Sequence, residues 1–264
     1  PYDSLVTVGM RGDGDEPMSE GTAIELLETV VADQRKIIAD VTGKPAQETP
    51  QVWALYKEVQ DYYDKGMTVP DDVTLLFADD NWGQIRRLPT KNLDREGGFG
   101  VYYHFDYVGV PRNYKWTNTV QIGKVWQQMN LAYERGARDL WVVNVGDLKP
   151  IEFPIDFFLT MAWDPEEMDQ QALQAHAPQF ASQVFGAELA TDIGRLLERY
   201  GTYAAMRKPE LLNQNTFAIG EPTAPELQAG EFYQHYAKWQ ELEADMEKVK
   251  ANIDESHYSA FFQL

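Results

Sequence analysis

The sequence has no cysteine and only four histidines among its 264 residues. Without cysteine, disulfide bonds and thiolate metal sites are excluded. The longest apolar runs fall far short of the roughly 20 residues that a membrane-spanning helix requires. Basic residues are also scarce, since 23 lysines and arginines stand against 42 aspartates and glutamates and give a net charge of −19. This charge disfavours binding to nucleic acid and to anionic membrane surfaces.

Hydrophobic residues make up 44% of the chain, which is typical of a globular protein with a sizeable core. In the first 150 residues the pattern predicts strands at 5–10, 52–56, 73–78, 100–105 and 140–145. Helices are predicted at 22–41, 59–64 and 120–135, with a short broken helix at 86–89. Apolar strands that alternate with helices indicate an α/β fold with a parallel sheet and right-handed crossovers.

The first predicted helix has apolar residues at helical spacing, which predicts one packed face made of Ile24, Leu27, Val30, Val31, Ile37, Ile38 and Val41.

No strand signal follows Ile151, and the remaining chain predicts helices at 154–162, 169–184, 188–206, 229–250 and 258–264. We therefore expect two domains, one at 1–164 and a helical bundle at 165–264. The chain opens almost directly on a strand and ends in an apolar helix without a stop signal. We expect it to be a piece of a longer protein.

Polar side chains follow the predicted strands at the points where the strands end. The first strand runs into a loop at 11–16 that holds Arg11 and Asp15, and the second runs into Glu58. Because adjacent parallel strands lie about 4.8 Å apart, Asp15 and Glu58 are placed for paired acid and base catalysis. The alternatives are a solvated loop for Asp15 and a first-turn helix acid for Glu58.

The third strand ends in Asp79, Asp80 and Asn81, and the fourth in His104 and Asp106. Carboxylates, an amide and one imidazole suit a hard metal cation. The same groups suit a network that hydrogen-bonds the hydroxyls of a sugar. Aromatic faces for a sugar ring would come from Trp82, Tyr103, Tyr107 and Trp116.

Cations gather in the loop after the fourth strand, at Arg112 and Lys115, and again at Lys149 after the fifth. In a chain of charge −19 they would hold an anionic ligand, such as a carboxylate, against an unfavourable overall field. For Lys115 and Lys149 an ordinary solvated surface role is equally open.

With these residues in place, the chain resembles the xylan α-glucuronidases of glycoside hydrolase family 115. The resemblance rests on long ordered blocks within residues 1–165, including VGMRGDGDEPM, VPDDVTLL, DDNWG, YYHFDYVG, PRNYKW and VNVGDLKP. It implies a (β/α)8 TIM barrel, of which this chain holds about strands four to eight, followed by an α-helical domain. It also implies an inverting glycosidase that releases glucuronic acid or its 4-O-methyl ether, α-1,2-linked to xylan, without a cofactor.

By the same resemblance, Asp15 is the general acid and Glu58 the general base, although Asp79 or Asp80 could replace either. The resemblance and the sugar-binding reading together predict substrate contacts from Arg11, Asp79, Asp80, Asn81, Trp82, His104, Tyr107, Arg112 and Asn144. Glucuronoxylan or its oligosaccharides would be the ligand, and no metal is expected.

Other readings stay open at this point. A metal-dependent barrel lyase or aldolase would use Asp79, Asp80 and His104, and a non-catalytic carbohydrate-binding fragment would bind without hydrolysis. Five strands cannot close an eight-stranded barrel, so we expect the piece alone to be inactive. We expect the full-length parent to be secreted or periplasmic, although no signal peptide opens this chain. A homodimer of the parent is an open alternative.

Overall fold

The computed structural model describes residues 4–12, 17–18, 23–107, 117–207, 211–218 and 230–263. The chain divides into two compact units, Pro1–His104 with Gln128–Asn144, and Phe105–Gln127 with Val145–Leu264. This division does not test the predicted boundary near Asp164, which stays a prediction.

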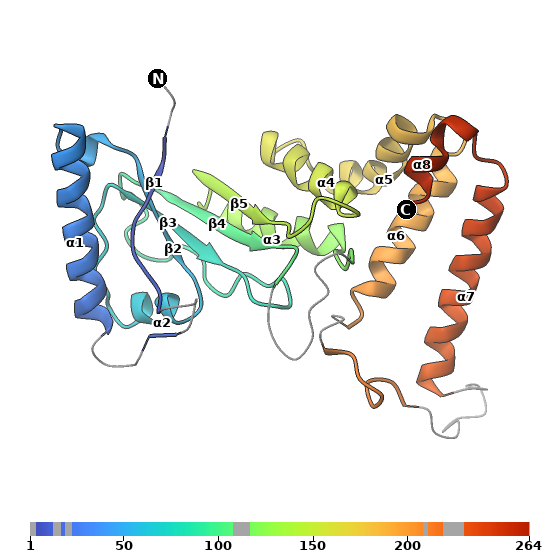
Figure 1. Cartoon of the computed structure of the whole chain (residues 1–264), viewed down its shortest axis with the longest axis horizontal. Coiled ribbons are helices and arrows are strands. Elements are labelled where there is room, and N and C mark those ends of the chain that lie inside the picture. The colour runs from blue at the N-terminus through green and yellow to red at the C-terminus, as the bar shows by residue number, and fades with distance from the viewer. Residues whose placement is uncertain are drawn as a thin grey trace. The chain divides into compact units, whose positions relative to one another are not determined.

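The first unit holds a parallel sheet whose strand order follows the chain, β1-β2-β3-β4-β5 (Figure 1). The strands are β1 (Val6–Thr7), β2 (Gln51–Leu55), β3 (Val73–Ala78), β4 (Phe99–His104) and β5 (Leu140–Asn144). The predicted first strand is too long, because only two of its residues join the ladder. The parallel α/β architecture is confirmed.

Register places the side chains of neighbouring strands in shared rows. Leu55 pairs with Phe77 and Phe77 with Val101, all three buried. Phe77 also stacks on Phe99 with ring centroids 5.9 Å apart. Burial of these apolar side chains on one face of the sheet fixes the register, because a slip by one residue would turn the row to the other face.

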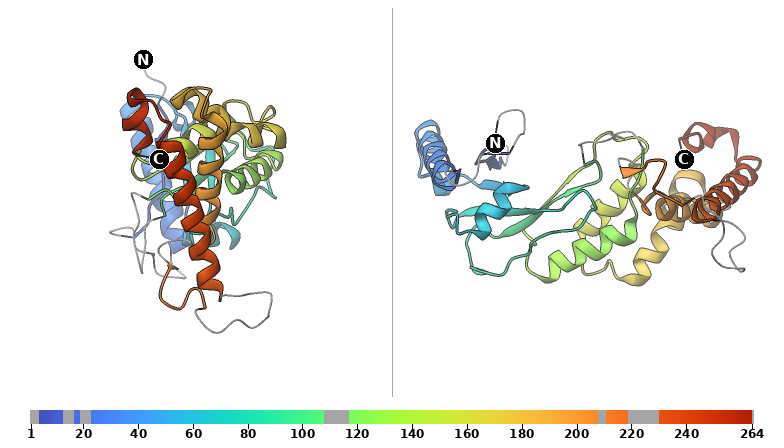
Figure 2. Two further views of the ribbon diagram at one scale, coloured as in Figure 1. Left: turned by 90° about the vertical axis from the view of Figure 1, so that its right-hand side faces the viewer. Right: turned by 90° about the horizontal axis from the view of Figure 1, so that it is seen from below.

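Helices α1 (Ala23–Thr42) and α2 (Glu58–Asp64) connect the first three strands, and α1 lies at the β1 end of the sheet (Figure 1 and Figure 2). Only Ala23, Leu27 and Val31 of α1 are buried. The predicted packed face is therefore wrong beyond the middle of the helix, where Ile37 is 61% and Val41 80% exposed. The apolar stripe of α1 extends beyond the surface that it packs against, so the end of the stripe is exposed to solvent.

The predicted broken helix at Arg86–Pro89 is also wrong, since these residues adopt no helix. Ile85 forms an antiparallel bridge with Asp79, which draws the segment back along the sheet. Arg86 and Arg87 then reach the carboxylates of α2, with Arg86 3.3 Å from Asp61. Proline at 89 removes a backbone donor and disfavours helix in the residue before it.

The second unit is helical. Its helices are α4 (Glu152–Trp163), α5 (Gln170–Phe185), α6 (Ala190–Ala204), α7 (Glu231–Lys250) and α8 (Tyr258–Phe261), with α3 (Ile122–Glu134) crossing the division between the units. Helices α6 and α7 lie side by side (Figure 2), joined by an ion pair of 2.6 Å between Arg199 and Asp245. None of the described helices is long and apolar enough to cross a membrane.

Candidate functional site

Arg11 and Glu58 form a paired contact where the chain leaves β1 and β2. The guanidinium donates from Nε to Glu58 Oε1 at 3.0 Å and from its Nη2 to Oε2 at 2.9 Å. Their side chains are only 13% and 15% exposed. Such a two-point bond between arginine and a carboxylate fixes the orientation of both groups. Two predicted site residues from different strand ends are thus brought together.

The path of the chain between β1 and Arg11 depends on Gly9. A Cβ at this residue would lie 2.3 Å from Nε1 of the buried Trp53, and its φ of +96° suits glycine. The side chain of Gln34 donates to the Gly9 carbonyl at 3.1 Å and accepts from its N–H at 2.8 Å. The close approach of Trp53 and the hydrogen bonds to Gln34 therefore fix the backbone two residues before Arg11.

Lys57 has a strained backbone between β2 and Glu58. Its φ of +48° and ψ of −117° lie in a region that side chains other than glycine rarely adopt. Its Nζ lies 5.1 Å from the ring centroid of Tyr56. Strain of this kind typically costs about 1–3 kcal/mol and often occurs at functional sites. Here it directs the chain from the strand into the first turn of α2, which begins at Glu58.

This strain predicts that Lys57→Gly is more stable than Lys57→Ala by about 1 kcal/mol in urea unfolding. Both variants lose the contact between the ammonium and Tyr56, so alanine is the matched control for glycine's freedom at positive φ. Equal stability of the two variants would show that the backbone at this residue is unstrained.

Tyr56, Tyr102 and His104 form a cluster of rings beside Arg11. The Arg11 guanidinium lies 5.0 Å from the Tyr56 ring centroid, and the His104 ring lies 5.4 Å from Tyr56 and 4.4 Å from Tyr102. Tyr102 and His104 are two residues apart on β4 and so share a face of the sheet. Sequence reasoning missed Tyr56 and Tyr102, although period-two alternation could have placed Tyr102 beside His104.

Asp79 follows β3 and binds His104. Its Oδ1 lies 2.6 Å from His104 Nδ1, and its Oδ2 accepts the backbone N–H of His104 at 3.2 Å. The Asp79 side chain is 0% exposed and that of His104 5%. We call Arg11, Glu58, Tyr56, Tyr102, His104 and Asp79 the strand-end cluster.

Asp80 and Trp82 belong to a tight turn after Asp79, and Asn81 lies between them. One carboxylate oxygen of Asp80 accepts the backbone N–H groups of Trp82 at 2.9 Å and of Gln84 at 3.0 Å. This side chain therefore closes the turn. The predicted contacts of these three residues with a sugar stay predictions.

The sequence predicted that the ring face of Tyr103 is open to a sugar, and this prediction is wrong. It is 3% exposed, and its hydroxyl donates to the Gly83 carbonyl at 2.8 Å. Burial, with Asp79 and Asp80 nearby, raises the pKa of the Tyr103 phenol. The alternation of β4 turns Tyr103 to the face opposite Tyr102 and His104.

The remaining predicted residues are distributed as follows. Asn144 ends β5 and pairs in register with His104. Tyr107 is described, but it belongs to the second unit. Asp15, Arg112, Lys115 and Trp116 lie outside the described residues, so the separation of the Asp15 and Glu58 carboxyls stays untested.

A metal ion would require several ligating side chains close together. Within that part of the chain, no three His, Asp or Glu side chains gather closely enough to hold a metal ion. Asp79 and His104 bind one another, while Asp80 binds backbone N–H groups. The metal-dependent reading, which uses Asp79, Asp80 and His104, therefore stays a prediction.

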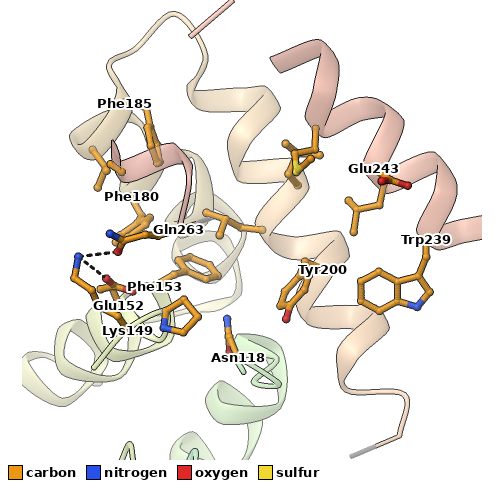
Figure 3. Close-up of a pocket in the computed structure, with 17 residues that line it drawn as sticks. Asn118, Lys149, Glu152, Phe153, Phe180, Phe185, Tyr200, Trp239, Glu243 and Gln263 are labelled. Atoms are coloured by element: carbon orange, nitrogen blue, oxygen red, sulfur yellow. Dashed lines mark hydrogen bonds and ion pairs between the residues drawn. The ribbon is translucent and has the colours of Figure 1, made fainter. Parts of the chain in front are cut away.

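The second unit contains a cavity of about 510 Å³ (Figure 3). Its wall is mainly aromatic and aliphatic, with Phe153, Phe180, Phe185, Tyr200 and Trp239 among the lining residues. At one end Lys149 Nζ lies 2.7 Å from Gln263 Oε1 and 3.5 Å from Glu152. Of the cations that the sequence suggested for an anionic ligand, Lys149 lines this cavity, whereas none of the predicted catalytic residues does.

Comparisons with known proteins agree with the resemblance read from the sequence. The family model for glycosyl hydrolase family 115 matches residues 1–211. Among solved structures, the chain is similar to a family GH115 4-O-methyl-α-glucuronidase with specificity for decorated arabinogalactans, at 33% identity and a TM-score of 0.85. That match covers 98% of this chain and 36% of the other chain. No curated protein matches the chain.

Proposed function

Since the chain belongs to glycosyl hydrolase family 115, we propose that it forms part of a glycosidase that releases glucuronic acid or its 4-O-methyl ether from a polysaccharide. The observation that carries this proposal is the strand-end cluster. It combines two carboxylates, a guanidinium, an imidazole and aromatic rings at the carboxyl ends of parallel strands. In barrel enzymes that edge of the sheet holds the active site.

The strand-end cluster provides groups that suit a uronic acid. Glu58 would act as general base toward a water, with Asp15 as general acid at the leaving oxygen. For inversion, two such carboxyls stand about 6.5–9.5 Å apart, which leaves room for that water. The bidentate contact with Arg11 holds the Glu58 carboxylate in one orientation, which favours a base that must address one water. Tyr56 and Tyr102 offer apolar ring faces near these groups.

We propose that the five strands are strands four to eight of an eight-stranded barrel in a longer polypeptide. This is supported by the open strand order, in which β1 and β5 occupy the two ends among the described residues. The chain also spans only 36% of the length of the glucuronidase that it matches. Closing the barrel would cover both edges of the sheet and complete the pocket.

The proposal predicts that the full-length protein releases glucuronic acid from glucuronoxylan oligosaccharides with inversion. Proton NMR during hydrolysis should detect the β-anomer first, because the substrate linkage is α. A glucuronidated arabinogalactan is the comparison substrate, since the matched enzyme is specific for decorated arabinogalactans. Release from either substrate supports a glucuronidase and identifies its polysaccharide. No release from either, with the protein folded, would contradict the proposed activity, and initial release of the α-anomer would contradict inversion.

A further inference from the structure

Both carboxylate oxygens of Asp79 contact His104. Oδ1 meets the Nδ1 ring nitrogen at 2.6 Å, while Oδ2 accepts the backbone N–H at 3.2 Å. Both side chains are almost completely buried. The rings of Tyr102 and Tyr56 lie 4.4 and 5.4 Å from the imidazole. Asp79 is thus directed at His104 rather than at solvent.

This arrangement selects one protonation form of the ring. An ionised carboxylate has only acceptor positions, so the ring nitrogen that faces it must carry the proton. A neutral imidazole has a single N–H, and a hydrogen bond at one nitrogen therefore determines what the other nitrogen can do. With Nδ1 as donor to Asp79, Nε2 is left as the acceptor of the ring.

We propose that Asp79 is a positioning residue, which fixes the Nδ1–H form and the orientation of His104 so that Nε2 can accept a hydroxyl of the uronic acid. The step to the sugar rests on the proposed function, in which His104 contacts the substrate. The hydrogen bond between the two residues does not depend on that function. Asp79 therefore acts on the sugar through His104 and does not itself touch it.

Asp79→Asn tests the proposal because an amide offers one acceptor and one donor. The backbone N–H of His104 can only donate, so the amide oxygen must turn toward it. The amide NH₂ then faces Nδ1, which has to become an acceptor, and the ring proton moves to Nε2. A carboxylate-to-amide change that imposes the wrong tautomer on a histidine is an established cause of large activity loss.

The direct measurement is nitrogen-15 NMR of the histidine rings in the full-length protein at mildly alkaline pH. The His104 signals are assigned by their disappearance in His104→Gln. We expect Nδ1 to be protonated in the wild type and unprotonated in Asp79→Asn. Asp80→Asn is the matched control and should leave the His104 tautomer unchanged, since Asp80 bonds backbone N–H groups of its own turn. An unprotonated Nδ1 in the wild type overturns the proposal even if the variant fails to fold.

A second measurement separates this proposal from the proposed function. In the full-length enzyme, Asp79→Asn should lower kcat/KM about 10²-fold, as expected for a misplaced contact group. In a His104→Gln background the same substitution should have almost no further effect, since Asp79 acts through His104. Equal losses in both backgrounds overturn the positioning role. If the tautomer switches but the wild type releases no glucuronic acid, the proposed function fails while the hydrogen bond to His104 stands.

Discussion

Glu58→Gln in the full-length protein is expected to lower the rate of glucuronic acid release about 10²–10⁴-fold, the usual contribution of a general base. Glutamine keeps the size of the side chain and one oxygen that can accept from Arg11, but it cannot take a proton from water. Because the substitution is nearly isosteric, substrate binding should change far less than kcat. The measurement is steady-state kinetics on glucuronoxylan oligosaccharides, alongside a thermal unfolding curve.

Asp61→Asn is the matched control for that variant. Asp61 is another acid of α2, but its side chain is 47% exposed and pairs with Arg86 across 3.3 Å. An exposed ion pair of this kind contributes little, so turnover should stay within about twofold of the wild type. Similar losses from both variants would indicate a general effect of charge on α2, and unchanged turnover in Glu58→Gln would remove Glu58 from the mechanism.

Gly100→Ala is expected to disrupt the sheet at the strand that carries Tyr102 and His104. A Cβ at this residue would lie 1.9 Å from the Leu140 carbonyl oxygen of β5 and 2.7 Å from the side chain of Leu76. Backbone cannot move away without breaking the pairing of β4 with β5, in which Gly100 is opposite Leu140. We expect a loss of more than about 3 kcal/mol, in the range of severe core substitutions, measured as soluble yield and urea midpoint.

Gly123→Ala supplies the same chemical change where space is open. This residue lies near the start of α3, and nothing lies within 4 Å of a Cβ built there. Alanine should stabilise the helix by about 0.4–1 kcal/mol by restricting the unfolded chain. If the two alanine variants had similar stability, the close approach of β4 and β5 at Gly100 would be contradicted.

Sequence patterns predicted the order of strands and helices well, because buried strands and amphipathic helices have strong periodicity. The third strand was predicted with its observed bounds, Val73–Ala78. The first was overextended, since an apolar run does not reveal how many of its residues find a partner strand. The exposed end of α1 was missed for a similar reason. An apolar stripe predicts which face of a helix is packed, but not how much of the helix the rest of the protein covers.

At the candidate site, residue types at the strand ends together with the family resemblance indicated Arg11, Glu58, Asp79 and His104, but not their pairing. The contact of Arg11 with Glu58 depends on how Gly9 and Lys57 direct the backbone, and neither conformation can be read from composition. Tyr103 was assigned to the sugar because it is aromatic, without regard to the alternation of side chains between the two faces of β4. Side chains on one strand must be assigned to faces before they are assigned to a ligand.

The proposed mechanism requires Glu58 and Asp15 to act on one sugar at the carboxyl ends of the strands. A crystal structure of the full-length protein with glucuronic acid bound tests this most directly. We expect the sugar beside Arg11 and the ring cluster, with the two carboxyls about 6.5–9.5 Å apart on opposite sides of its anomeric carbon. A sugar bound elsewhere, or an Asp15 carboxyl directed away from it, would contradict the account.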